Sequence, residues 1–237
     1  MAERTADLRR PCFMAYRWTI RLLLTLQKAH RKLLGTIIPI VWISMRTKEF
    51  EPDEIADAAM RVFWERGYAA TSVQDLVEGT GLSRSSLYST FESKQGLYQQ
   101  ALRRYQAITT ANVELMAGPG STKDVIQQLL MRIVEDELGD PQRRGCLVAN
   151  ATLELAGHDE SVAELVAHNF QRLLKALEKL IIRGQQSGEI AAEKNPRALA
   201  RFFVNTMQGM RVLGKGSPAR QRRQCLLDVI DVALNTL

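Results

Sequence analysis

Residues 71–90 read TSVQDLVEGTGLSRSSLYST, and this stretch decides the fold. Its apolar residues recur at helical spacing in two short runs that are separated by glycine. Thr71 is followed three residues later by Gln74, which predicts a capping box at the start of the first helix. Gly81 allows a tight turn, and Ser83 is expected to cap the second helix. Two short helices joined in this way are typical of a helix-turn-helix.

The second helix of this pair is suited to the major groove of DNA. Arg84 lies in its first turn, where recognition helices meet base edges. Arginine pairs bidentately with guanine, and small serine side chains permit a close approach to the duplex. The polar outer face that we expect to meet DNA consists of Ser83, Arg84, Ser85, Ser86, Tyr88 and Ser89.

Helical spacing continues through the rest of the chain, and no convincing strand pattern occurs after residue 49. Ser93 is expected to cap a long helix that ends near Ala117, before a Gly-Pro-Gly-Ser linker. Further helices are expected over residues 122–138, 146–156, 159–187, 196–213 and 218–237. We therefore predict an all-α protein, with an N-terminal three-helix DNA-binding head that contains the helix-turn-helix and a larger C-terminal helical body.

The charge is unevenly distributed along the 237 residues, whose net charge is +6. Residues 1–44 carry eight Lys or Arg and two acidic residues, so the whole excess lies there and the remainder is balanced. A DNA-binding surface must therefore be a local patch.

Three separated cysteines without a CxxC pair favour a reducing compartment, and neither a metal site nor a cofactor is expected. No uncharged stretch is long enough to span a bilayer.

Residues 1–44 differ in composition from the rest of the chain, because they mix arginine with tryptophan and aliphatic residues. Three kinds of targeting or membrane segment compete for this stretch: a transit peptide, a secretory signal and a membrane-surface helix. It is poor in serine, and Arg21 interrupts its apolar core, which disfavours the first two. We expect a non-native or disordered basic extension, with Met45 as the true start.

The stretch from Ala56 to Tyr105 resembles the TetR family of bacterial transcriptional regulators. The residues that carry the resemblance are Phe63, Gly67-Tyr68, Ala70-Thr71-Ser72-Val73, Gly81-Leu82-Ser83, Leu87-Tyr88, Phe91, Ser93-Lys94 and Leu97. The resemblance implies a DNA-binding domain over residues 49–105, with the helix-turn-helix at about 72–91. It also implies an effector-binding and dimerisation domain over residues 122–237.

The same resemblance assigns roles to single residues. Thr71, Tyr88 and Lys94 would contact phosphates, and the serines around Arg84 would meet bases and phosphates. Ser89 and Thr90 stand where the family often has a bulky aromatic residue and a histidine, so the operator of relatives does not transfer to this chain. The expected protein is a cytoplasmic homodimer that dimerises through residues 196–213 and 218–237. It would bind an inverted-repeat operator in double-stranded DNA as a repressor, and an unidentified small molecule would release it.

A possible sensor site is predicted in the helix that begins near residue 146. Cys146, Asn150 and Glu154 recur every four residues and would form one polar stripe in an otherwise apolar helix. A thiol-sensing or electrophile-sensing regulator that uses Cys146 is the alternative, since Arg143 and Arg144 precede the thiol. An enzyme and a membrane-surface protein are the remaining alternatives. No catalytic residues are expected, because the sequence contains no nucleophile elbow, HExxH motif or phosphate loop.

Overall fold

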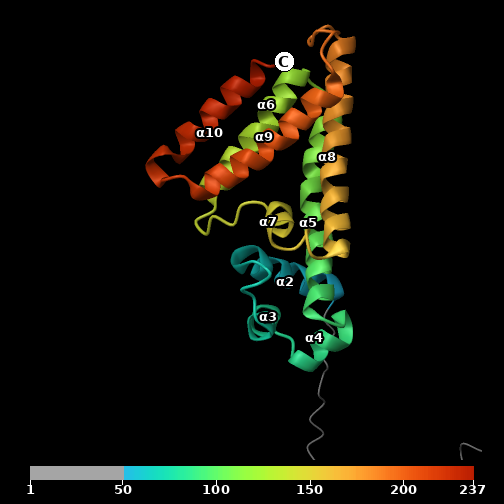
Figure 1. Cartoon of the computed structure of the whole chain (residues 1–237), viewed down its shortest axis with the longest axis vertical. Coiled ribbons are helices and arrows are strands. Elements are labelled where there is room, and N and C mark those ends of the chain that lie inside the picture. Colours follow the sequence, from blue (N-terminus) through green and yellow to red (C-terminus); the bar gives the residue numbers. More distant parts are fainter. Residues whose placement is uncertain (1–50) are drawn as a thin grey trace, which may run out of the picture. The chain divides into compact units, whose positions relative to one another are not determined.

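The computed structural model describes residues 51–237, and the extension expected at residues 1–44 lies outside them. The described part is helical throughout, so the all-α prediction is confirmed. Its helices, labelled as in Figure 1, are α2 (Pro52–Arg66), α3 (Val73–Thr80), α4 (Arg84–Phe91), α5 (Lys94–Ala117), α6 (Thr122–Gly139), α7 (Leu147–Glu154), α8 (Glu160–Gln186), α9 (Pro196–Gly216) and α10 (Ala219–Leu234). None of these helices is both long and apolar enough to cross a membrane.

Short polar side chains set most of the helix starts. The side chains of Ser83, Ser93, Ser121 and Asp159 each accept a backbone N–H from the first turn of the helix that follows. Such caps satisfy N–H groups that have no partner within the helix. The caps predicted at Ser83 and Ser93 are therefore confirmed.

The helix-turn-helix head packs around aromatic and aliphatic side chains of α2–α5. Phe63 and Tyr98 are fully buried, and their rings meet edge to face with centroids 4.9 Å apart. The same apolar cluster continues into α7 and the start of α8 through Leu147, Ala151 and Val162. The head therefore has no core of its own that is separate from these two helices, and the body holds it through continuous apolar packing.

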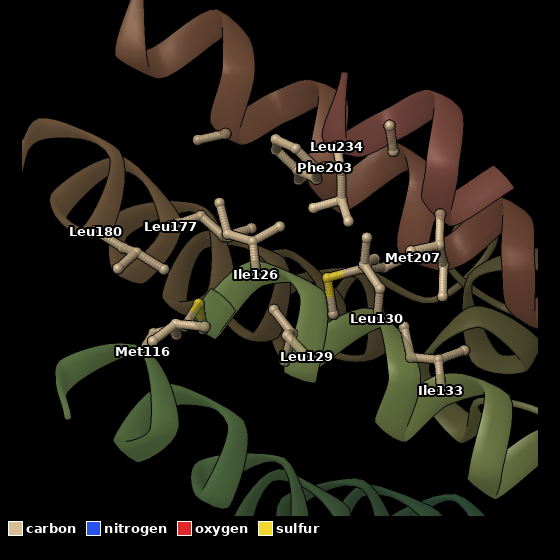
Figure 2. Packing of buried hydrophobic residues seen from close by; sticks show 14 of the residues in the cluster. Met116, Ile126, Leu129, Leu130, Ile133, Leu177, Leu180, Phe203, Met207 and Leu234 are labelled. Carbon is tan, nitrogen blue, oxygen red and sulfur yellow. The ribbon is translucent and has the colours of Figure 1, made fainter. Parts of the chain in front are cut away.

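A second apolar cluster lies between α6, α8, α9 and α10. Figure 2 shows part of it, with Ile126, Leu130 and Phe203 fully buried among leucine and methionine side chains. Truncation of such a leucine to alanine typically costs about 2–5 kcal/mol, because a cavity remains. The long helices α5 and α8 lie side by side (Figure 1) and join this second cluster to the head.

Candidate DNA-binding surface and effector cavity

The turn between α3 and α4 depends on glycine. Gly81 adopts the left-handed conformation with a φ of 71°, and its N–H donates to the carbonyl of Val77. Residues with a Cβ rarely adopt that conformation without strain. The chain then reverses through Leu82, which is buried, and Ser83 starts α4. The helix-turn-helix geometry predicted from the spacing is thus present.

The recognition helix α4 has one buried and one exposed side. Leu87 and Phe91 are buried against the head, whereas Ser83, Arg84, Ser85, Tyr88 and Ser89 are exposed. The guanidinium of Arg84 lies 5.8 Å from the centroid of the Tyr88 ring one turn later. This contact supports the long side chain without occupying its hydrogen-bond donors. No acidic residue lies in the first turn of α4, so the positive end of the helix dipole is not neutralised there.

The serines of α4 are partly occupied by bonds to one another. The Ser83 hydroxyl oxygen accepts the Ser86 N–H at 3.1 Å and lies 2.9 Å from the hydroxyls of both Ser85 and Ser86. Ser89 donates its hydroxyl to the carbonyl of Ser86 at 3.0 Å. Ser86 is half-buried. These serines keep the face small and ordered, which suits close approach to a duplex.

The prediction that Thr71 caps the first helix of the pair is wrong. Ser72 is the cap, and it forms a capping box with Asp75 rather than with Gln74. The Thr71 side chain is buried, and its hydroxyl donates to the carbonyl of Gly67. It therefore exposes no hydroxyl for the phosphate contact expected of it.

The start of α3 also carries its own carboxylate. Hydrogen bonds from Ser72 hold the pKa of Asp75 below its ordinary value, and Arg66 pairs with the same carboxylate at 2.6 Å. A charged carboxylate at this helix end disfavours a phosphate there. The starts of α4 and α5 carry no acidic residue, and they are the better places for phosphate contacts.

Lys94 stands at the first position of α5, as the resemblance requires. Its ammonium lies 4.3 Å from the centroid of the Tyr68 ring, and burial lowers its pKa from the ordinary value. Because the side chain is half-buried and held against an aromatic face, its charge is fixed in place at the end of the head.

The structure brings together only two residues of the expected sensor stripe, since Asn150 and Glu154 line one small pocket and Cys146 does not. Cys146 is 7% exposed and packs within the apolar cluster of the head, which is the environment of a structural thiol. Asn150 donates to the carbonyl of Arg144 at 3.1 Å. Glu154 instead points at the head, where its Oε2 accepts the backbone N–H groups of Tyr68 at 2.7 Å and Ala69 at 3.1 Å.

Glu154 thereby fastens the end of α7 to the turn between α2 and α3. Gly67 precedes the two donating residues, has a φ of 79°, and would place a Cβ 2.6 Å from Oε1 of Glu154. The turn thus needs glycine for its backbone conformation and for the approach of the carboxylate. Sequence spacing gave the helical period correctly but could not show which side of α7 meets the head.

A cavity of about 640 Å³ lies between the head and the body. The resemblance implied an effector site within residues 122–237, but it did not imply that Trp64 and Tyr105 would line the cavity too. Trp64 of α2, Tyr105 of α5 and Arg211 of α9 line it, together with the end of α6 and the loop that follows. The Trp64 indole donates to the carbonyl of Gly145 at 2.9 Å, and the Arg144 guanidinium lies 4.6 Å from the Trp64 ring centroid. The volume lies within the range of about 300–1,000 Å³ typical of small-molecule sites.

Ion pairs connect the wall of this cavity to the last two helices. Glu137 of α6 accepts from Arg211 at 3.3 Å and from Arg222 of α10 at 3.0 Å. Arg211 also pairs with Asp136 at 2.8 Å. Burial raises the pKa of Tyr105, beside this group, well above its ordinary value, so its hydroxyl is neutral. The side chains of Glu137 and Arg222 are 2% and 6% exposed, so this is a buried network.

The outer faces of α9 and α10 expose large apolar side chains. Phe202, Val212, Leu213 and Val232 are 39–67% exposed. Phe202 and Val232 line a shallow apolar depression with Val229 and Ala233. Exposed apolar surface gathered on two neighbouring helices is typical of a protein–protein interface.

Comparison with known proteins gives matches over both parts of the chain. Residues 55–101 match the family described as bacterial regulatory proteins, tetR family, and residues 126–224 match the family described as tetracyclin repressor-like, C-terminal domain. The uncharacterized HTH-type transcriptional regulator YezE of Bacillus subtilis (strain 168) is 31% identical over 195 residues, covering 81% of this chain and 98% of YezE. The HTH-type transcriptional repressor ComR of Escherichia coli (strain K12) is 28% identical over 169 residues, covering 70% of this chain and 80% of ComR.

A solved structure of similar fold contains DNA. It is a cysteine mutant of the TetR family transcriptional regulator CifR, complexed with a 26-base-pair double-strand operator. The TM-score is 0.71 at 30% sequence identity, and the match covers 80% of this chain and 98% of that one.

Proposed function

This chain belongs to the TetR family of bacterial transcriptional regulators, and we propose that it is a homodimeric repressor released from its operator by a small molecule. The observation that carries the DNA-binding part is the face of α4. An exposed Arg84 is supported there by Tyr88 and surrounded by small side chains, while Leu87 and Phe91 anchor the helix from behind. Such a helix fits a major groove about 12 Å wide.

The exposure and contacts of each side chain in the head indicate its role in DNA binding. We assign direct readout of bases to Arg84, because its guanidinium is exposed in the first turn of α4. Ser83, Ser85, Tyr88, Ser89 and Lys94 are assigned to phosphate contacts and close approach, with Ser86 as support. Thr71 is left out of this assignment because its hydroxyl is buried and bonded to Gly67.

The dimer is proposed to form through the exposed apolar faces of α9 and α10. A two-fold dimer presents the same surface from both protomers, and it places two recognition helices in successive major grooves. The operator is then an inverted repeat whose half-sites lie about 34–36 Å apart, or near a multiple of that distance.

The cavity between head and body is proposed as the effector site. Trp64 belongs to the head and lines the cavity directly, so a bound molecule contacts the element that carries the DNA-binding surface. Binding that favours a different position of Trp64 relative to Gly145 would change the spacing of the two recognition helices. The affinity for DNA and the affinity for the effector are then coupled reciprocally.

The test compares Arg84→Ala with Lys94→Ala in the full chain, on operator DNA and on random DNA over a range of salt concentrations. Arg84→Ala is expected to weaken operator binding by about 1–3 kcal/mol and to relax sequence preference at one base pair. Lys94→Ala is expected to weaken both DNAs alike and to reduce the salt slope by about 1. If the two variants behave identically, the assignment of base readout to Arg84 and of phosphate contact to Lys94 is contradicted.

A further inference from the structure

The residues that line the cavity between head and body indicate the chemical class of its ligand. This inference rests on the proposed role of that cavity as the effector site. The cavity is lined by two aromatic rings, Trp64 and Tyr105, and by charged side chains from α6, α9 and the loop after α6. These charged groups differ in how many of their hydrogen-bond donors and acceptors are already used within the described residues.

The two Nη atoms of Arg144 remain available as hydrogen-bond donors. Its Nε donates to Asp140 at 3.2 Å, and its backbone N–H donates to the same carboxylate oxygen at 2.7 Å. Neither of its two Nη atoms donates a hydrogen bond to any group of the described residues 51–237. The Trp64 ring and Asp140 hold the guanidinium plane in place, and the side chain is 28% exposed. A fixed guanidinium edge with two free nitrogens is the geometry that binds a carboxylate bidentately.

Most carboxylates of the cavity wall are already paired with arginines. Asp136 and Glu137 both pair with Arg211, and Asp140 pairs with Arg144. Glu135, the fourth carboxylate of the lining, is exposed to water. The Nη atoms of Arg144 are thus donors that no carboxylate of the described residues takes up.

A ligand amine would meet carboxylates that are already paired with arginines, whereas a ligand carboxylate would meet the unoccupied Nη donors of Arg144. The cavity is much larger than a carboxylate group, and Trp64, Tyr105 and Ile108 offer apolar surface for the rest of a ligand. We propose that this cavity binds a small organic carboxylate, with its acidic group held by the Nη atoms of Arg144 and its apolar part against these three side chains.

The position of the anchor also suggests how the ligand acts. Arg144 is covalently next to Gly145, whose carbonyl accepts the Trp64 indole N–H. A carboxylate bound to Arg144, with its apolar part against Trp64, contacts residues on both sides of that hydrogen bond. The ligand therefore acts on α2 of the head through two adjacent residues of the loop.

The experiment measures ligand binding without DNA. Trp18→Phe and Trp42→Phe in the full chain leave Trp64 as the sole tryptophan, so its fluorescence reports the cavity. The probes are three matched pairs: benzoate and benzamide, phenylacetate and phenylacetamide, octanoate and octanamide. At least one carboxylate is expected to bind saturably and at least tenfold more tightly than its amide.

The variant Arg144→Gln should remove that tenfold preference, so that the carboxylate and its amide bind with similar affinity. Arg143→Gln is the matched control, because its guanidinium donates to the carbonyl of Ser217 and does not line the cavity. It should leave carboxylate affinity within threefold. The proposal is overturned if no carboxylate binds more tightly than its amide, or if Arg144→Gln keeps the preference. The acid–amide comparison needs no variant at Arg144, so it remains decisive if that variant does not fold. Operator binding without ligand is measured separately, and its failure would count against the regulator function instead.

Discussion

Replacement of Glu154 tests how the body holds the DNA-binding head. Both backbone N–H groups that reach this residue donate to one oxygen, Oε2, at 2.7 Å from Tyr68 and 3.1 Å from Ala69. Hydrogen bonds to a charged group contribute about 1.5–3 kcal/mol each to stability. Ala69 is exposed, so its N–H regains water when the carboxylate is removed, whereas the N–H of half-buried Tyr68 does so only in part.

The loss on Glu154→Ala is therefore close to that of one charge-assisted bond, about 2 kcal/mol. Glu154→Gln should cost only about 1 kcal/mol, since its amide oxygen can accept both N–H groups without the charge. Urea unfolding followed by circular dichroism measures both losses, at one fixed protomer concentration because a dimer's stability depends on concentration. Glu164→Ala, at an exposed position of α8, is the control and should change little.

Two outcomes would refute this reasoning. One is a Glu154→Ala variant within about 0.5 kcal/mol of the parent, well below the cost of one charge-assisted bond. The other is a Gln variant as unstable as the Ala variant, which would mean that acceptance by the oxygen is not what matters. Gly67→Ala adds a geometric check, because its Cβ would lie 2.6 Å from Oε1 of Glu154. Part of its cost should disappear when Glu154 is already alanine.

Three further outcomes are expected. Glu137→Gln leaves the buried guanidinium of Arg222 without its charged partner and leaves Arg211 with Asp136 alone, and urea unfolding should show a loss of about 3–5 kcal/mol. A loss under about 1 kcal/mol would contradict the buried pairing. Ser72→Ala removes the cap of α3 and should cost about 1 kcal/mol in thermal unfolding, and an unchanged melting temperature would count against that cap. Burial alone would raise the pKa of Asp140, but the backbone N–H and guanidinium of Arg144 hold it below its ordinary value of 3.8. The stability from Asp140 is therefore fully present above that value and lost as the pH falls through the lowered folded pKa. Urea midpoints measured from pH 7 to pH 2 should fall less steeply at the acid end for Asp140→Asn than for the parent, and parallel curves would contradict this.

Local signals in the sequence were sufficient for most of the helix starts. Ser83 and Ser93 each precede an apolar helical pattern, and each is the cap that the pattern predicts. Thr71 and Ser72 offered two neighbouring hydroxyls, and the cap was assigned to the wrong one. The carboxylate of Asp75 decides between them, because it lies three residues after Ser72 and returns a hydrogen bond to that cap.

The effector region was less predictable, because residues far apart in the sequence build it. Trp64 and Gly145 are 81 residues apart, and Glu137 and Arg222 are 85 apart, yet each pair forms a direct hydrogen bond. The spacing of Cys146, Asn150 and Glu154 gave the correct helical period. It could not reveal that Glu154 faces the head, since that depends on how α7 packs against α2 and α8.

The central claim is that this chain recognises a specific inverted repeat through α4. The most direct test is selection of fragmented genomic DNA from the source organism by the purified full chain, at physiological salt and with competitor DNA, followed by sequencing. The account predicts enrichment of an inverted repeat whose half-sites are spaced by about one helical turn or near a multiple of it, and loss of that enrichment in Arg84→Ala. A folded, dimeric protein that enriches no common sequence would contradict it.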